Sequence, residues 1–160
     1  MNINRDKYLN DLINRMNNGM IKVVTGIRRC GKSYLIFTIF RNYLLKQGVD
    51  ESHIISIELD QRKDRKYRNP DNILDFIESV IVDDEQYYVL LDEVQLLEEF
   101  EEVLNSLLHI RNVDVYVTGS NSKFLSKDVI TEFRGRGDEI HIYPLTFKEF
   151  MQVYEGDVYH

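Results

Sequence analysis

The chain alternates short apolar runs with longer segments in which apolar residues recur at helical spacing. The short runs lie at 20–25, 53–59, 87–91, 113–118 and 138–143, and each is expected to form a strand. The run at 87–91 is apolar throughout, which is typical of a strand buried on both faces of a parallel sheet.

The longer segments predict the helices that connect these strands. Asp71 is expected to cap one of them, and Thr146 with Glu149 forms a capping box before the last. Strands that alternate with helices indicate an α/β fold with a mainly parallel sheet. The predicted helices lie at 5–17, 34–45, 71–80, 96–110, 124–133 and 145–154.

A glycine-containing loop separates the first strand from the helix at 34–45. It reads Gly-Ile-Arg-Arg-Cys-Gly-Lys-Ser, the G-x-x-x-x-G-K-S signature of a phosphate-binding loop. Its glycines let the backbone approach an anion, and the N-terminus of the following helix favours negative charge. Lys32 is expected to reach the β- and γ-phosphates, and the Ser33 hydroxyl to bind Mg²⁺. The candidate nucleotide-binding residues are Gly26, Ile27, Arg28, Arg29, Cys30, Gly31, Lys32, Ser33 and Tyr34.

Three side chains in this loop each have a second interpretation. Arg28 and Arg29 either touch phosphates or a neighbouring subunit, or are ordinary exposed arginines. The thiol of Cys30 lies near Lys32 and a helix N-terminus, which favours a lowered pKa and oxidation. The alternative is that Cys30 fills a position that the motif leaves unspecified.

The strand at 87–91 is followed directly by Asp92 and Glu93. An apolar strand that ends in Asp-Glu, after a phosphate-binding loop, is the Walker B pattern. The carboxyl end of a parallel strand opens onto the ligand crevice. Asp92 is therefore expected to hold the Mg²⁺ shell through water, beside the Ser33 hydroxyl, and Glu93 to act as the general base that orients the attacking water.

The strand at 113–118 is also followed by polar residues. Thr118, Ser120 and Asn121 are candidates for a contact with the γ-phosphate or its attacking water. The alternative is a plain Gly-Ser-Asn turn in which Ser122 caps the next helix. The sequence alone does not choose among the three.

Composition narrows the remaining classes of function. A net charge of −7 and a pI of about 5.1 argue against a general nucleic-acid or anionic-membrane surface. One cysteine and four scattered histidines give no internal disulfide and no zinc spacing. No signal peptide and no apolar run of membrane-spanning length is evident, so we expect a cytoplasmic protein without a membrane partner.

One stretch, at 61–70, is clearly basic. It follows the second strand and is expected at the same edge of the sheet as the phosphate-binding loop. It is either a contact for nucleic acid or a protein partner, or a solvated connecting loop.

Taken together, these motifs resemble the AAA-type ATPases of bacteria and archaea in which the ATPase domain precedes a C-terminal domain of unknown function. The resemblance covers about Tyr8 to Phe150. It is carried by Gly26–Ser33, Leu91–Gln95, Thr118–Leu125, Phe133–Gly137 and Tyr143–Phe150.

The resemblance implies a three-layer α/β/α P-loop NTPase core with the strand order 5-1-4-3-2. It also implies that Arg134 and Arg136 hold the place of an arginine finger, which acts on ATP in a neighbouring subunit. The alternative is an ion pair within the domain or a direct contact with phosphate. We expect residues 1–160 to form one ATPase core without the helical lid and C-terminal domain of the family.

The predicted function is Mg²⁺-dependent binding of ATP and slow hydrolysis, since a core without its lid encloses adenine less well. A homo-oligomer and an unknown protein partner, or the missing C-terminal domain, are further expectations. Two alternatives stay open: a nucleotide-dependent switch or scaffold with little hydrolysis, and a nucleic-acid-associated regulatory ATPase.

Overall fold

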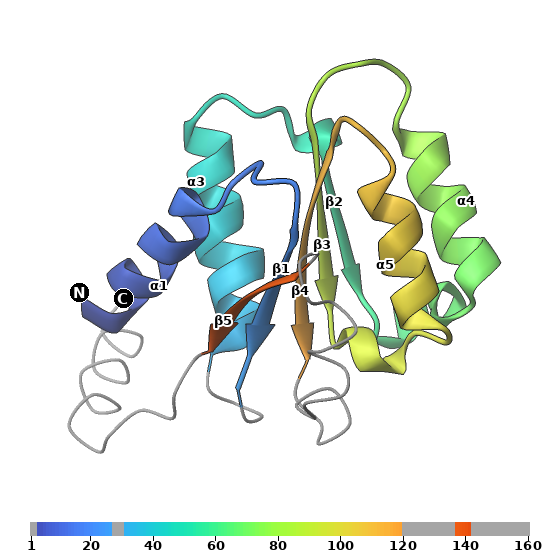
Figure 1. Ribbon diagram of the computed structural model, residues 1–160, viewed down its shortest axis with the longest axis horizontal. Coiled ribbons are helices and arrows are strands. Elements are labelled where there is room, and N and C mark those ends of the chain that lie inside the picture. The colour runs from blue at the N-terminus through green and yellow to red at the C-terminus, as the bar shows by residue number, and fades with distance from the viewer. Residues whose placement is uncertain (1–2, 27–30, 120–136, 142–160) are drawn as a thin grey trace.

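The computed structural model describes residues 3–26, 31–119 and 137–141, and these form a parallel sheet between two layers of helices (Figure 1). The sheet has five strands in the order β2-β3-β4-β1-β5, and each pair of neighbours is parallel. The predicted fold class and strand order are confirmed. The strands are β1 (Ile21–Thr25), β2 (Ile54–Glu58), β3 (Tyr87–Asp92), β4 (Val113–Gly119) and β5 (Gly137–His141).

Helices cover both faces of this sheet. Figure 1 shows α1 and α3 on one face, and α4 and α5 on the other. The helical segments are α1 (Ile3–Asn14), α2 (Lys32–Tyr34), the π-helix η1 (Leu35–Phe40), α3 (Arg41–Lys46), the 3₁₀ segments η2 (Glu51–His53), η3 (Arg62–Arg68) and η4 (Val94–Leu96), α4 (Pro70–Val80) and α5 (Phe100–Leu108).

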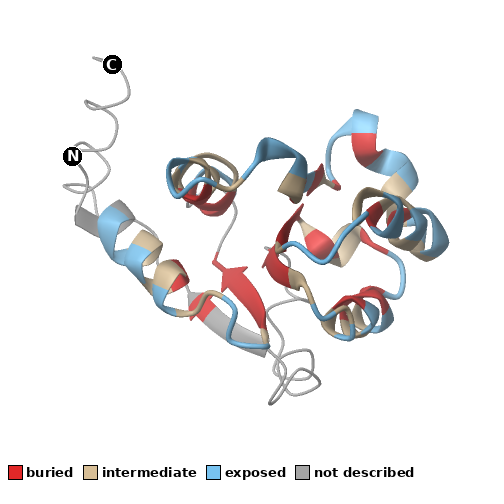
Figure 2. Ribbon diagram, turned by 90° about the horizontal axis from the view of Figure 1, so that it is seen from above, coloured by how far each residue is buried: buried red, intermediate tan, exposed pale blue. Residues whose placement is uncertain are grey.

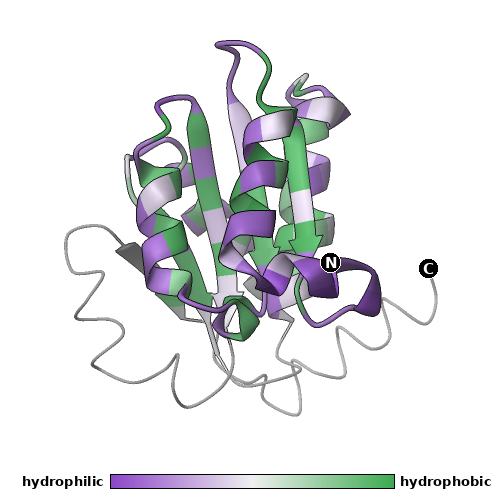
Figure 3. Ribbon diagram, turned by 90° about the vertical axis from the view of Figure 1, so that its right-hand side faces the viewer, coloured by the Kyte–Doolittle hydropathy of each residue, from purple (hydrophilic) through white to green (hydrophobic). Residues whose placement is uncertain are grey.

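Alternate residues of each strand enter two separate hydrophobic cores, as the pleat requires. In β3, Val89 and Leu91 pack toward α4 and α5, whereas Tyr88 and Leu90 pack toward α1 and the helices after β1. Every residue of β3 is buried. Figure 2 shows the buried residues concentrated in the strands, and Figure 3 shows the hydrophilic positions on the outer sides of the helices.

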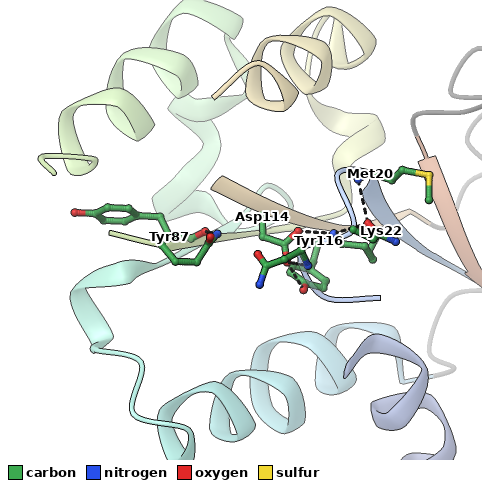
Figure 4. Close-up of polar contacts among 8 residues, drawn as sticks. Met20, Lys22, Tyr87, Asp114 and Tyr116 are labelled. Carbon is green, nitrogen blue, oxygen red and sulfur yellow. Dashed lines mark hydrogen bonds and ion pairs between the residues drawn. The ribbon is translucent and has the colours of Figure 1, made fainter. Parts of the chain in front are cut away.

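A polar cluster is buried at the amino edge of the sheet, in the layer that faces α1 (Figure 4). Lys22 of β1 forms an ion pair with Asp114 of β4, and both side chains are almost fully buried. Asp114 also accepts hydrogen bonds from the Tyr116 hydroxyl at 2.5 Å and from the Asn17 backbone N–H at 2.9 Å. The Lys22 ammonium lies 4.9 Å from the centroid of the Tyr116 ring. These contacts satisfy the buried charges and tie β1 to β4.

The first helix after β1 differs from the regular helix predicted at 34–45. It runs without a break from Lys32 to Lys46, but its middle, η1, is a π-helix. The i→i+5 spacing of a π-turn brings Leu35 and Phe40 onto one face, and both are buried against the sheet.

The prediction that Asp71 caps the helix α4 is wrong. Asn69 has extended backbone angles, and its side chain accepts a hydrogen bond from the Asn72 N–H at 3.1 Å, so Asn69 is the cap of α4. Pro70 then occupies the first helical position, where its missing N–H costs nothing.

Two further segments depart from the predicted bounds. The helix expected at 96–110 begins only at Phe100, because Glu99 takes a left-handed conformation with φ 51°. The basic stretch connects β2 to α4 as the largely exposed segment η3. It is anchored by the buried Asp64, whose carboxylate accepts from the Glu58 N–H at 2.8 Å. In the part of the chain that the structure describes, no helix has both the length and the apolar character to cross a membrane.

Candidate functional site

The site lies at the carboxyl ends of three adjacent central strands, β1, β3 and β4, at the lower edge of the sheet in Figure 1. Each of these strands ends at or beside a residue that the sequence analysis predicted for the site: Gly26 after β1, Asp92 in β3 and Thr118 in β4. Parallel strands bring such ends together at one edge, which is where α/β sheets bind ligands.

The two ends of the glycine loop have conformations that favour glycine. Gly26 has φ 147° and Gly31 has φ 96°, both in the region that side chains disfavour. The Lys32 ammonium donates a 3.0 Å hydrogen bond to the Gly26 carbonyl, and its side chain is only 4% exposed. The Leu35 N–H donates to the Gly31 carbonyl at 2.9 Å and begins the helix. Lys32 thus joins the end of β1 to the start of the helix.

Asp92 is the centre of the polar contacts at this edge. Its Oδ1 accepts from the Ser33 hydroxyl at 2.8 Å and from the Thr118 hydroxyl at 2.5 Å. Because Asp92 is 5% exposed, these hydroxyls replace much of the water that a carboxylate needs. The contacts bring the first helical turn after the glycine loop to the ends of β3 and β4.

The electrostatic environment of Asp92 is unfavourable to its negative charge. Burial raises the pKa of this carboxyl above its usual range, while the hydrogen bonds from Thr118 and Ser33 act in the opposite direction. The charges of Asp60 and Glu93 raise the pKa further. A cation at this position would relieve both the burial penalty and the repulsion.

Glu93 has a left-handed backbone conformation, with φ 56° and ψ 54°, which is uncommon for a residue with a side chain. Its N–H donates to Thr118 Oγ1 at 2.9 Å, and its carbonyl accepts from the Leu96 N–H at 3.0 Å. Gln95 Nε2 donates to Glu93 Oε2 at 2.6 Å. The turn after β3 is therefore held from both β4 and η4.

The structure brings together several of the sequence-predicted residues: Gly26, Gly31, Lys32, Ser33, Asp92, Glu93 and Thr118. Of the three candidates after the fourth strand, Thr118 joins Asp92 and Glu93. Tyr34 lies in the same turn as Ser33 and is 44% exposed. Several of the predicted site residues lie outside the described part of the chain, and their roles stay predictions: Ile27, Arg28, Arg29, Cys30, Ser120, Asn121, Arg134 and Arg136.

The sequence analysis included Gln95 in the motif at 91–95 but assigned it no role. Its signal was a polar residue two positions after Glu93, in a stretch that otherwise turns apolar. The spacing gives no indication that its amide folds back onto the Glu93 carboxylate, since that contact depends on the left-handed turn.

The donor chemistry of the site fits Mg²⁺. Ser33 Oγ and Asp92 Oδ1 are oxygen atoms 2.8 Å apart on separate elements, and both could bind such an ion. Mg²⁺ is commonly held by one or two such groups, with phosphate oxygens and water completing its shell. Among the described residues, no group of three or more His, Cys, Asp or Glu side chains forms a metal-binding cluster, so these two oxygens would supply only part of the shell.

The family model of the AAA domain matches residues 18–151, a span that contains every residue of this site. The chain belongs to the AAA domain family. An uncharacterized protein of Haemophilus influenzae is 35% identical over 156 residues, which cover 97% of this chain and 39% of that protein. This AAA domain chain thus spans about two fifths of the length of that relative.

Solved structures share the fold of this AAA domain at low sequence identity. The Aeropyrum pernix ORC1 protein, solved in complex with DNA, has a TM-score of 0.69 and 15% identity over 99% of this chain and 50% of that one. AMPPCP-bound DnaA from Aquifex aeolicus has a TM-score of 0.56 and 15% identity over 95% of this chain and 49% of that one. These likenesses show the three-layer P-loop fold, and membership in the AAA family supports nucleotide binding.

Proposed function

We propose that this AAA domain binds Mg·ATP at the carboxyl edge of its sheet and hydrolyses it slowly. The observation that carries the proposal is the convergence on Asp92 Oδ1 of two hydroxyls, from Ser33 behind the glycine loop and from Thr118 at the end of β4. This arrangement joins the loop, the acidic strand end and the neighbouring strand in one site. DnaA, a structural neighbour, was solved with AMPPCP, which is consistent with a nucleotide as the ligand.

In this proposal each side chain has a distinct task. Lys32 leaves the Gly26 carbonyl and binds the β- and γ-phosphates, and the glycine loop donates backbone N–H groups to them. Ser33 and Asp92 hold Mg²⁺, which supplies charge neutralisation for the phosphates. Glu93 orients the attacking water and accepts its proton. Thr118 fixes the position of the Asp92 carboxylate relative to the Glu93 backbone, through its hydrogen bonds to both.

Two substitutions separate binding from hydrolysis. Lys32→Ala should abolish measurable Mg·ATP binding, because it removes the buried cation of the loop. Glu93→Gln should leave binding within about twofold and lower kcat by about 10²–10⁴-fold, because it removes the general base. Binding is measured with a fluorescent ATP analogue, and hydrolysis by phosphate release with and without Mg²⁺.

The matched controls are Lys46→Ala at the end of α3 and the exposed Glu98→Gln, which should both resemble the wild type. Full activity of Glu93→Gln would remove Glu93 from the mechanism. Binding without any wild-type hydrolysis would favour the alternative function, a nucleotide-dependent switch or scaffold.

The proposal extends to a homo-oligomer in which Arg134 or Arg136 reaches the ATP of a neighbour. Hydrolysis per mole of chain should then rise with protein concentration, and Arg134→Ala or Arg136→Ala should lower the plateau by about 10³-fold or more. A rate per mole that stays flat over a wide concentration range would contradict action in trans.

A contact with nucleic acid is a second candidate function, and η3 is the observation that favours it. Four exposed cations, Arg62, Lys63, Arg65 and Lys66, lie on this short ordered segment beside β2. The structurally similar ORC1 protein was solved in complex with DNA, but at 15% identity this likeness supports only the shared fold. Filter binding at low and high salt tests the idea: retention of DNA or RNA at low salt, lost in Arg62→Ala/Lys66→Ala, is expected.

A further inference from the structure

Gln95 makes a specific contact with the acid that the proposed hydrolysis depends on. It lies in η4, two positions after Glu93, and its Nε2 donates to Glu93 Oε2 at 2.6 Å. Only the amide nitrogen can face a carboxylate in this way, because the amide oxygen would repel it. The contact therefore fixes the orientation of the Gln95 amide.

No described residue donates a hydrogen bond to the other end of this amide. Gln95 Oε1 is shielded from solvent and finds no hydrogen-bond donor among the residues that the structure describes. A buried acceptor without a donor is uncommon in folded proteins and calls for an explanation. The contact with Glu93 explains it. Because Nε2 is turned toward the carboxylate, the amide oxygen points to a position where no described residue donates to it.

Glu93 is held twice, by groups from two different elements. Thr118 of β4 accepts its backbone N–H at 2.9 Å, which fixes where the side chain leaves the chain. That bond does not fix the rotatable bonds of the side chain itself. Gln95 restrains those bonds by holding the carboxylate at its far end.

We propose that Gln95 is a positioning residue for Glu93, and that it sets the direction in which the carboxylate meets the attacking water. The inference rests on the proposed function. In phosphoryl transfer the protein acts mainly by positioning and electrostatics, so a poorly oriented water-activating group costs rate. Gln95 itself touches neither substrate nor the reacting atoms; it acts through Glu93.

The test is a double-mutant cycle in the full chain. Gln95→Met keeps the length and bulk of the side chain but removes the donor. It should lower kcat by about 10–100-fold while KM for ATP stays within about twofold. In the Glu93→Gln background the same change should alter kcat by less than about twofold, because the group that Gln95 positions is already disabled.

Gln95→Glu is a second variant of nearly the same shape that places a carboxylate against Glu93. It should lower kcat at least as far as Gln95→Met does. The matched control is Gln47→Met, an exposed glutamine directly after α3, which should leave kcat unchanged. Circular dichroism melting confirms that each variant is folded.

The outcomes separate this inference from the function on which it rests. An active wild type that loses hydrolysis in Glu93→Gln but not in Gln95→Met overturns the inference alone. So does a kcat that rises in Gln95→Met, or a loss that adds fully to that of Glu93→Gln. A wild type without Mg²⁺-dependent hydrolysis, or one indifferent to Glu93→Gln, overturns both.

Discussion

At the scale of single residues, the Thr118 hydroxyl serves two partners at once. It donates to Asp92 and accepts from the Glu93 N–H, and Thr118 is fully buried. A hydroxyl is needed for this, because only a group with both a donor and an acceptor can join a carboxylate to a backbone N–H.

Thr118→Val should therefore destabilise the domain by about 1–3 kcal/mol, since it leaves the Glu93 N–H without its acceptor. It should also lower kcat more than it weakens ATP binding. Urea unfolding and steady-state hydrolysis measure the two effects. Thr118→Ser, which keeps the hydroxyl, should retain most of both properties; equal losses in the two variants would contradict the bridging role.

The buried carboxylate of Asp92 is expected to lower the stability of the domain at neutral pH, although the proposed Mg·ATP binding needs it. Its pKa is raised mainly by burial, so the native state keeps its proton to higher pH than the unfolded state does. The unfolding free energy then falls as pH rises from the unfolded-state value of 3.8 through the native pKa.

Asp92→Asn removes the titrating group, and with it the fall in unfolding free energy as the pH rises. Without Mg²⁺ at neutral pH, the variant should melt at or above the wild-type temperature, although its Mg·ATP binding falls about tenfold or more. Melting curves from about pH 4 to 7 should show a wild-type decline that the variant lacks. Asp75→Asn on the exposed side of α4 is the control. A variant clearly less stable than the wild type at pH 7 would refute the burial argument.

At the scale of elements, the start of α4 shows how the helix cap can be assigned to the wrong one of two nearby capping residues. Asn69 and Asp71 both have side chains that cap helices, and the sequence analysis chose Asp71. Pro70 decides between them, because proline favours the first helical position and so places the cap immediately before it.

Asn69→Ala should accordingly cost about 1 kcal/mol of unfolding free energy, the usual value of a lost N-cap. Asp71→Ala should cost less, about 0.3–1 kcal/mol, because it removes only a charge that favours the helix N-terminus. Chemical denaturation of the two variants side by side provides the comparison. A larger loss in Asp71→Ala would place the cap where the sequence analysis had it.

The strands were predictable because buried parallel strands are apolar. Their order was an expectation from the resemblance to the AAA-type ATPases, and the sheet has that order. The meeting of Ser33, Asp92 and Thr118 follows from the same topology, since parallel strands end at one edge. The left-handed turn at Glu93 and the Gln95 contact were not predictable. They depend on which hydroxyl of a neighbouring strand accepts the Glu93 N–H, and periodicity carries no such information.

At the scale of the whole molecule, the Lys22–Asp114 pair (Figure 4) lies near the amino ends of β1 and β4, whereas the candidate site lies at the carboxyl ends of these strands. Either residue alone would be an unpaired buried charge. Lys22→Met or Asp114→Asn should each destabilise the domain by about 3–5 kcal/mol. That is a large part of the 5–15 kcal/mol typical of a domain.

The double variant Lys22→Met/Asp114→Asn should lose clearly less than the sum of the single changes, because no charge is left unpaired. Denaturation of all four proteins gives the coupling. Where the variants remain folded, their kcat should match the wild type, because the pair is at the far edge of the sheet. Strict additivity would show that the two side chains do not act as a pair.

The position of β1 in the sheet has a consequence for the order of events during synthesis. β1 carries the glycine loop, yet its neighbours in the sheet are β4 and β5, and its partner Asp114 comes 92 positions after Lys22. Of the described strands, β1 is synthesised before the others, and it must therefore wait for most of the described chain before it can pair. Such distant pairing slows folding. The earliest part of the nucleotide site to be made is among the last to acquire its shape, and a nascent chain should resist protease at β1 only after β4 has emerged.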